Sequence, residues 1–205
     1  MVKPLIIKQI MGTICRMKFM ILAALALYAD QAIGQKAVKP VPDGNYYIVR
    51  HAEKDTGNNP GLTAAGYLRA GDLYRTLRNK KISRIYVTQY RRTQLTADSI
   101  RIYQKIEPVQ YSADDTGDDL FLKLSGIKRD IILKNNVLIV GHSNTIPAIL
   151  KRLGITALDI HDIPDNEYDN LFVVTIKNGK ASLKWLNYGK ASQPATSTGK
   201  MKPLQ

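Results

Sequence analysis

The chain has 205 residues, 44% apolar and 23% charged, which suits one soluble domain with a real core and is too short for two large ones. Its formal charge is +13, and it is about +10 without residues 1–34, which hold four basic residues and one acidic residue. Such an excess favours an anionic partner. The Lys and Arg residues are scattered without aromatic residues between them, so nucleic acid is not the expected partner.

Residues 1–34 have the pattern of a signal peptide. Basic residues precede an apolar run over 19–29, and small residues at positions 32 and 34 predict cleavage before Gln35. The run is shorter than the ~20 apolar residues that span a bilayer. We therefore expect a secreted or periplasmic protein with no stable membrane anchor after cleavage. An uncleaved anchor is the alternative, and Met11 or Met17 is an alternative start.

The one cysteine, Cys15, lies in the segment that we expect to be removed. The mature chain would then contain no disulfide, no thiolate zinc site and no cysteine nucleophile. A chain without cysteine suits export, because it offers no thiol for unwanted oxidation. A bulky Ile14 before the cysteine argues against attachment as a lipoprotein.

After a polar lead-in at 35–44, apolar strand patterns alternate with helical patterns. We expect strands at 46–49, 84–88, 108–111, 137–140, 171–176 and 181–186, and helices at 63–79, 93–103, 119–133 and 145–153. The alternation predicts an α/β domain over 45–190, a three-layer α/β/α sandwich with a mostly parallel central sheet. The run at 137–140 is the most apolar and should be central. The last two strands should form a hairpin, and the polar tail at 191–205 should be disordered.

Two of the three histidines follow expected strands within two residues. These are His51 and His142. Arg50 precedes the first, and Arg91 and Arg92 are expected in the loop after another strand. Because the carboxyl ends of parallel strands meet at one sheet edge, these side chains should share a pocket. The pocket would hold two imidazoles and two guanidiniums.

Such a pocket is suited to a phosphate group. A guanidinium offers paired donors that match two phosphate oxygens, and helix N-termini expected near Thr93 and Thr145 add oriented N–H groups. An imidazole among them can attack phosphorus in line and form a phosphohistidine. Fixed positive charges disfavour a metal ion between His51 and His142, and no Cys or carboxylate completes a ligand set at short spacing. We therefore expect no metal and no cofactor.

Four segments in order resemble the motifs of the histidine phosphatase superfamily, which includes the phosphoglycerate mutases. They are YIVRHAEK at 47–54, the L-T-x-x-G pattern at 62–66, TQYRRTQLTA at 88–97 and VGHS at 140–143. The R-H-A-E-K sequence at 50–54 looks like that of a compact branch. The resemblance implies a phosphoglycerate mutase-like fold, with His51 as the phosphate-accepting nucleophile. It implies that Arg50, Arg92 and His142 are the phosphate ligands.

The chain departs from the family pattern in places. Ala52 stands where Gly is usual, and Thr88-Gln89 stands where Ser-Pro is usual. The acid that protonates the leaving group is unassigned, as many members supply it from an insert that this chain lacks. The candidates for this acid are Glu53, which is close to His51 in the sequence, and Asp114 and Asp115, which lie in an acidic turn.

Two polar residues follow the second histidine. Ser143 and Asn144 are candidates for orienting His142 or touching substrate, and either could instead cap the next helix. The third histidine, His161, is expected at the surface.

These observations predict a metal-independent phosphatase that hydrolyses phosphomonoesters or phosphoramidates, acting on a small phosphorylated substrate or a phosphoprotein. One alternative is a phosphoglycerate mutase-type phosphotransferase, although export argues against glycolytic substrates. The other is a non-catalytic binder of phosphorylated ligands. Specificity is expected to come from the loops at 54–61, 112–119 and 155–169. The sequence carries no signal for the oligomeric state.

Overall fold

The structure is a computed structural model that describes residues 40–126, 135–158 and 162–192. The expected signal peptide, the lead-in up to residue 39, His161 and the tail from residue 193 lie outside the described residues. Within the described ranges, no helix has the length and apolarity that a membrane span requires.

Ten elements make up the described part of the domain, and strands alternate with helices up to the final hairpin. The strands are β1 (Gly44–Arg50), β2 (Arg84–Thr88), β3 (Val109–Tyr111), β4 (Asn135–Gly141), β5 (Asn170–Lys177) and β6 (Lys180–Asn187). The helices are α2 (Ala64–Leu77), α3 (Arg91–Gln104), α4 (Asp118–Ser125) and α5 (Thr145–Arg152). The expected strands and helices are confirmed, apart from the boundaries discussed below.

The strands form one six-stranded sheet in the order β3-β2-β4-β1-β5-β6. The pairs β1–β4, β2–β4 and β2–β3 are parallel, whereas β1–β5 and β5–β6 are antiparallel. The expected central position of β4 is confirmed, because it lies between β2 and β1. The carboxyl ends of β1, β2 and β4 therefore meet at one edge of the sheet.

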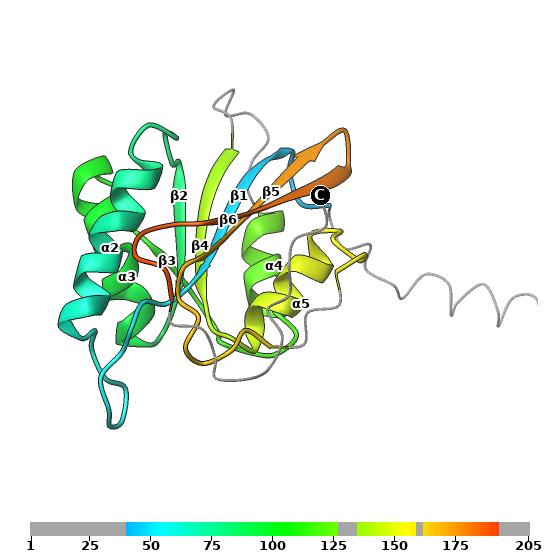
Figure 1. The fold of residues 1–205 in the computed structure, drawn as a ribbon. Coiled ribbons are helices and arrows are strands. Elements are labelled where there is room, and N and C mark those ends of the chain that lie inside the picture. The colour runs from blue at the N-terminus through cyan, green and yellow to red at the C-terminus, as the bar shows by residue number, and fades with distance from the viewer. Residues whose placement is uncertain (1–39, 127–134, 159–161, 193–205) are drawn as a thin grey trace, which may run out of the picture. The chain divides into compact units, whose positions relative to one another are not determined.

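Helices cover both faces of the sheet, with α2 and α3 on one side and α4 and α5 on the other (Figure 1). The alternation of side chains along each strand explains this arrangement. In β1, Tyr46 and Ile48 belong to the core cluster that contains the α4 and α5 residues, while Tyr47 and Val49 belong to the cluster beneath α2 and α3. The domain is thus the expected three-layer α/β/α sandwich with a mixed, mainly parallel sheet.

The β5–β6 hairpin turns where the sequence predicts it. Asn178 and Gly179 both have positive φ angles, 52° and 72°, which is the conformation that Asn-Gly favours in a tight hairpin.

Most boundaries lie within two residues of the prediction, but two differences change the interpretation. The expected loop position of Arg91 and Arg92 is wrong, because α3 begins at Arg91 and both residues lie in its first turn. The helix expected at 119–133 begins one residue earlier and ends at Ser125, where Gly126 is the C-cap. The remainder of that prediction, from residue 127, lies outside the described residues.

Of the tail at 191–205 that we expect to be disordered, the structure describes only residues 191 and 192. The hydroxyl oxygen of Ser192 accepts hydrogen bonds from the N–H groups of Tyr168 and Asp169. Ser192, which the sequence places in a disordered tail, therefore makes specific contacts with the domain.

Candidate active site

His51 is the first residue after β1 and is buried. Its backbone N–H donates to the carbonyl of Gly141 at 3.0 Å, which continues the β1–β4 pairing past the strand end. In the ring, Nδ1 lies 2.8 Å from the carbonyl oxygen of Ala52. Because a carbonyl only accepts, Nδ1 carries the proton in the neutral ring, and Nε2 has a free lone pair. The ring is therefore held in the tautomer that a nucleophile attacking through Nε2 requires.

His142 is the first residue after β4, and its ring centroid lies 5.4 Å from that of His51. Nη2 of Arg92 lies 3.3 Å from Nδ1 of His142, and the hydroxyl of Thr88 lies 3.0 Å from Nε2. Because a guanidinium only donates, Nδ1 accepts, and the neutral ring carries its proton on Nε2. The two imidazoles thus present opposite tautomers to the same site.

Arg92 lies in the first turn of α3, half-buried beside the second histidine. Its guanidinium carbon lies 4.3 Å from the centroid of the Tyr90 ring, a cation–π contact. Burial lowers the pKa of Arg92, as does the positive charge of Arg50, whereas Tyr90 raises it. Within the described residues, Nε of Arg92 is buried and has no hydrogen-bond partner. This donor is available to an anion at the site.

Arg50 ends β1 and is almost fully buried, yet it contacts the loop before β5. Nη1 donates to the carbonyls of Pro164 at 2.7 Å and Glu167 at 3.4 Å, and Nη2 lies 3.1 Å from Oδ1 of Asp165. The guanidinium stacks on the Tyr168 ring at 4.5 Å. In the described part of the chain, Nε of Arg50 has no partner either. The arginine is thus charged and only partly compensated.

The electrostatics keep both imidazoles neutral. Burial lowers the pKa of His51 to about 3, although its bond to Ala52 raises it, and Arg50, His142 and Arg92 lower it further. Burial lowers the pKa of His142 to about 4, and Arg92 and Arg50 add to that effect. Both rings are therefore unprotonated at neutral pH, and the net charge of the site comes from the two guanidiniums.

The loop after His51 is held by the two helices on one face of the sheet. From α3, the hydroxyl oxygen of Thr96 accepts from the N–H of Ala52 at 2.9 Å. From the start of α2, Thr63 donates its backbone N–H to the carbonyl of Glu53 at 3.0 Å. A Cβ on Gly66 would lie 2.2 Å from the same carbonyl oxygen, so only glycine permits this approach. The L-T-x-x-G pattern is thus a platform for the loop that follows the first histidine.

Glycine has a comparable role before the second histidine. A Cβ on Gly141 would lie 3.0 Å from the Thr145 hydroxyl oxygen and 3.2 Å from the Tyr111 hydroxyl oxygen. The Thr145 hydroxyl oxygen also accepts from the N–H of His142 at 3.0 Å. This tight packing fixes the point where β4 turns into α5.

The structure separates the three candidate proton donors. Both carboxylate oxygens of Glu53 accept from Arg69, so its lone pairs are committed to an ion pair. Oδ1 of Asp114 accepts from the Thr116 hydroxyl and the N–H of Asp118. These bonds lower the pKa of Asp114 more than burial raises it. Such bonds favour the ionised carboxylate of Asp114, which argues against it as the acid, while the Glu53 carboxylate is held by Arg69.

Asp115 differs because it connects to the second histidine segment. Its Oδ1 lies 2.6 Å from the side-chain amide nitrogen of Asn144, two residues after His142. Asn144 is the N-cap residue of α5 but makes no side-chain capping bond, so it joins Asp115 to the site instead. The carbonyl of Ser143 accepts from the N–H of Ile163 at 3.4 Å, which ties the same segment to the loop before β5.

Five residues near the site carry no role in the sequence interpretation: Thr88, Tyr90, Tyr168, Asp165 and Arg69. Tyr90 meets the His142 ring edge-on at 5.3 Å, and the Tyr168 ring lies 6.1 Å from that of His51. Thr88 and Tyr90 lie inside the motif at 88–97, so the sequence could have indicated them. Tyr168 and Asp165 reach the site from a loop more than 110 residues away, without any local signal.

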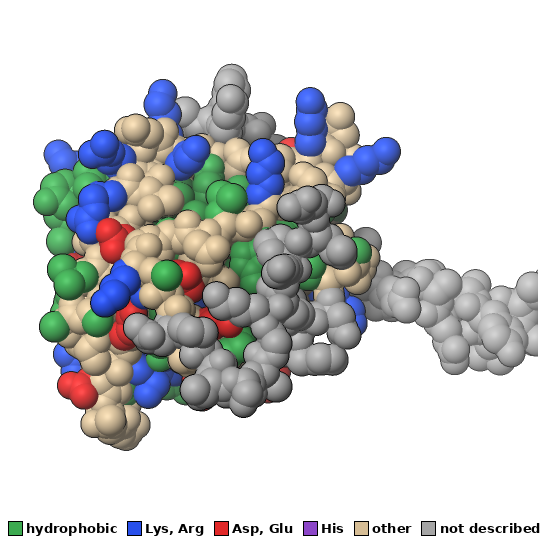
Figure 2. All heavy atoms as spheres, viewed as in Figure 1, with side chains coloured by type: hydrophobic (Ala, Val, Ile, Leu, Met, Phe, Trp, Pro, Cys, Tyr) green, Lys and Arg blue, Asp and Glu red, His purple; other side chains and the backbone are tan. Residues whose placement is uncertain are grey.

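No metal centre is assembled from the described residues: no group of three or more His, Cys, Asp or Glu side chains comes close enough to hold an ion. Lys and Arg side chains are spread over the face seen in Figure 2, with Asp and Glu among them, rather than gathered in one continuous stripe. The positive charge that bears on the chemistry is that of the buried Arg50 and the half-buried Arg92.

Residues 46–114 match the family model of the histidine phosphatase superfamily (branch 1). The match begins in β1 and covers three of the four motifs, with His51 and Arg92, so the resemblance that these motifs carry is confirmed, and the motif at 140–143 lies outside the matched residues. The domain has the histidine phosphatase fold. No curated protein sequence matches the chain. Assignment to a compact branch marked by R-H-A-E-K stays a prediction.

Solved structures share this fold at low sequence identity. A protein assigned as the phosphohistidine phosphatase SixA of Agrobacterium tumefaciens superposes with a TM-score of 0.50 at 19% identity, over 72% of this chain and 97% of that one. SixA in complex with tungstate superposes with a TM-score of 0.51 at 15% identity, over 70% of this chain and 96% of that one. A mycobacterial glucosyl-3-phosphoglycerate phosphatase superposes with a TM-score of 0.54 at 10% identity, over 73% of this chain and 100% of that one. The matched proteins are thus covered nearly end to end.

Proposed function

We propose that the protein is a phosphatase that hydrolyses phosphomonoesters or phosphoramidates through a phosphohistidine on His51. The observation that carries the proposal is the His51 ring, which is neutral, fixed with Nε2 free, and close to Arg50, Arg92 and His142. The names of SixA and of the mycobacterial phosphatase are compatible with such chemistry. The proposal names the phosphoryl group that is transferred and does not name the rest of the substrate.

The reaction has two steps. Nε2 of His51 attacks phosphorus, the bond from phosphorus to the leaving oxygen or nitrogen breaks, and the leaving group takes up a proton. Water then attacks the phosphohistidine, loses a proton, and releases inorganic phosphate with the neutral ring restored. Two easier barriers replace one high barrier.

The side chains around His51 supply the charge that the transferring group needs. The phosphoryl group carries negative charge on three equatorial oxygens in the transition state, and donors fixed in advance stabilise it without reorganisation. Arg50 and Arg92 supply the guanidiniums, and each has a buried Nε donor that is unpaired within the described residues. A neutral His142 can donate or accept after a small shift of its bonds to Thr88 and Arg92.

The neutral state of His51 is central to this proposal. A protonated imidazole has no lone pair for attack, and the lowered pKa keeps Nε2 unprotonated across the physiological range. When the dianionic phosphoryl group is attached, its charge faces the two guanidiniums. We propose that this chemistry needs no metal ion, because the two arginines take the place of one. Activity should therefore persist in excess chelator.

Trapping of the intermediate tests the proposal. The protein is mixed with a small phosphate donor, quenched at alkaline pH, where phosphohistidine is stable, and digested for mass spectrometry. Phosphate should be found on His51, and the His51→Ala variant should lose both label and turnover, by about 10⁴-fold or more. His161→Ala is the matched control, as it removes a histidine outside the four motifs. An active His51→Ala variant would sink the proposal.

The same experiment distinguishes the two alternatives that the sequence analysis left open, a mutase-type phosphotransferase and a non-catalytic binder. Transfer of the label to a sugar acid without net phosphate release would indicate a phosphotransferase of the mutase type. Tight phosphate-ester binding without release or labelling would indicate a non-catalytic binder.

We also propose that the enzyme acts outside the cytoplasm, on the evidence of the N-terminal sequence pattern alone. Mass spectrometry of the protein recovered from cell fractions tests this. A mature chain beginning at Gln35 in the extracytoplasmic fraction is expected. An intact N-terminus in the membrane fraction would favour the uncleaved anchor.

A further inference from the structure

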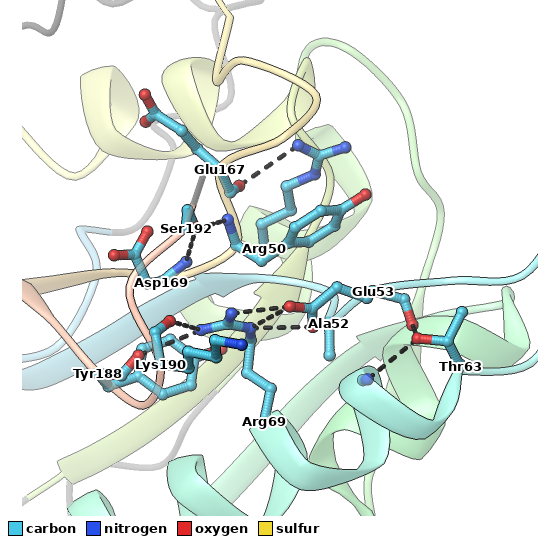
Figure 3. A network of polar contacts seen from close by, with 12 residues as sticks. Arg50, Ala52, Glu53, Thr63, Arg69, Glu167, Asp169, Tyr188, Lys190 and Ser192 are labelled. Atoms are coloured by element: carbon cyan, nitrogen blue, oxygen red, sulfur yellow. Dashed lines mark hydrogen bonds and ion pairs between the residues drawn. The ribbon is translucent and has the colours of Figure 1, made fainter. Parts of the chain in front are cut away.

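Arg69, in the second turn of α2, is a buried arginine that is not one of the proposed phosphate ligands. Its side chain is 5% exposed. Nε and Nη2 donate to the carboxylate of Glu53 at distances of 2.7 to 2.9 Å, a side-on pair that uses both oxygens (Figure 3). Bidentate pairs of this kind are among the strongest and most directional side-chain interactions. Arg69 thus fixes the position of the Glu53 side chain.

The other side of the same guanidinium holds the C-terminal segment, residues 188–192. Nη1 donates to the carbonyls of Tyr188 at 3.3 Å and Lys190 at 2.9 Å. The Ser192 hydroxyl oxygen in turn accepts from the N–H of Tyr168 at 2.8 Å (Figure 3). One segment is therefore bonded both to the loop after His51, through Arg69, and to the tyrosine that stacks on Arg50.

The consequence for His51 follows from the covalent structure of the backbone. The carbonyl of Ala52, which accepts from Nδ1 of His51, belongs to the peptide group that Ala52 shares with Glu53. That group is planar, so its orientation depends on how both residues are held. Thr96 holds the N–H of Ala52, and Arg69 holds the side chain of Glu53. A rotation at Glu53 would carry the carbonyl oxygen away from the ring.

We propose that Arg69 is a positioning residue: through Glu53 it fixes the Ala52–Glu53 peptide group and thereby holds His51 in the tautomer that leaves Nε2 free. The consequence for catalysis rests on the proposed function. The consequence for the ring does not, since it concerns a hydrogen bond of the protein itself. A purely structural Arg69 would affect unfolding but not the His51 tautomer.

Two conservative variants test the proposal. Arg69→Lys keeps the charge but loses the side-on geometry, and Glu53→Gln keeps the shape but loses the charge. Either should lower kcat with a small phosphate ester about 10- to 100-fold, the cost of a slightly misplaced nucleophile, while KM changes little. The matched control is Arg75→Lys on the same helix, where Arg75 forms an exposed pair with Asp72. It should leave kcat unchanged.

The decisive measurement is the ¹⁵N NMR spectrum of the His51 ring in each variant at neutral pH. The wild type and Arg75→Lys should show a single tautomer with Nδ1 protonated, and Arg69→Lys and Glu53→Gln should show exchange with the Nε2-protonated form. If one of the two variants does not fold, the other still decides. Folded variants with an unchanged ring spectrum would overturn the proposal. A wild type without phosphatase activity would refute the proposed function alone.

Discussion

Nε2 of His142 lies 3.0 Å from the hydroxyl oxygen of Thr88, which is completely buried. The same oxygen is 3.0 Å from the Thr93 hydroxyl and accepts from the N–H of Tyr90. It therefore stands at the centre of a small network that fixes the second histidine from the end of β2. Thr88 is the last residue of β2, so the network lies at the carboxyl end of that strand.

Thr88→Val removes this hydroxyl and keeps the shape of the side chain. The change leaves the proton on Nε2 of His142 without its acceptor in a buried place, which should lower the free energy of unfolding by about 1–3 kcal/mol. The His142 ring would also lose its fixed orientation, and kcat should fall. Urea denaturation and steady-state kinetics measure the two effects. Thr88→Ser restores the hydroxyl and should recover most of the activity; if valine and serine behave alike, the hydroxyl does not orient the ring.

Asp165→Asn should increase the affinity for inorganic phosphate or tungstate. The Asp165 side chain is 98% exposed but lies against Nη2 of the buried Arg50, a donor that a phosphate oxygen would use. Exposed pairs are worth up to about 1 kcal/mol, so the dissociation constant should fall about 2- to 5-fold. Isothermal titration measures it, with Asp162→Asn, an exposed acid of the same loop, as the control. Equal effects of the two variants would point to general charge rather than competition for Arg50.

The histidines predict a pH dependence of stability. An unfolded histidine has a pKa near 6.5, and the folded values are about 3 for His51 and about 4 for His142. The unfolded chain therefore binds more protons below about pH 6.5, so stability is fully present above that pH and is lost as the pH falls through the folded values. The urea midpoint should drop between about pH 7 and about pH 5. His51→Gln should reduce that drop, and an unchanged slope would contradict the lowered pKa of His51.

Much of this site was predictable because its parts lie at strand ends. His51 and His142 each follow an apolar strand run, and adjacent parallel strands bring their carboxyl ends together. The position of Arg91 and Arg92 was missed because Tyr90, the N-cap residue of α3, makes no side-chain capping bond. A sequence search for a capping residue therefore begins the helix too late, at Thr93.

The contacts that were not predicted cross long stretches of sequence. Asp165 and Tyr168 contact Arg50 from a loop that contains no motif. Because this loop is more than 110 residues from Arg50 in the sequence, no local pattern predicts the contacts. Arg69 did carry a signal: it lies on the α2 stripe with Gly66 and Leu73, where an apolar residue is expected. A charge on an apolar stripe needs a buried partner, here Glu53.

Gly66→Ala tests the platform beneath the loop that follows His51. The new Cβ would lie 2.2 Å from the carbonyl oxygen of Glu53, a backbone atom, so the loop or the helix must move. We expect a loss of about 1–3 kcal/mol in the free energy of unfolding and a lower kcat. Gly71→Ala on the same helix is the control, because its Cβ would meet only the flexible Arg75 side chain, at 3.3 Å. It should stabilise the helix by about 0.5–1 kcal/mol. Similar destabilisation in both variants would contradict the steric explanation.

Asp115→Asn tests the acid that would work opposite His51. Of the three candidates, Asp115 alone contacts the second histidine segment, through Asn144. A proton donor matters most when the leaving group is poor, so kcat/KM for an alkyl phosphate should fall about 10²-fold or more. With p-nitrophenyl phosphate, whose leaving group needs no proton, the loss should be only a few-fold.

The matched control is Asp114→Asn, which alters the neighbouring carboxylate that organises the turn through Thr116 and Asp118. It should lower stability, with the same kinetic effect on both substrates. Steady-state kinetics of both variants on both substrates give the comparison. A leaving-group dependence that is unchanged in Asp115→Asn would mean that the proton comes from solvent. In that case the natural substrate is expected to be a phosphoramidate, because its nitrogen leaves without help from a carboxylic acid.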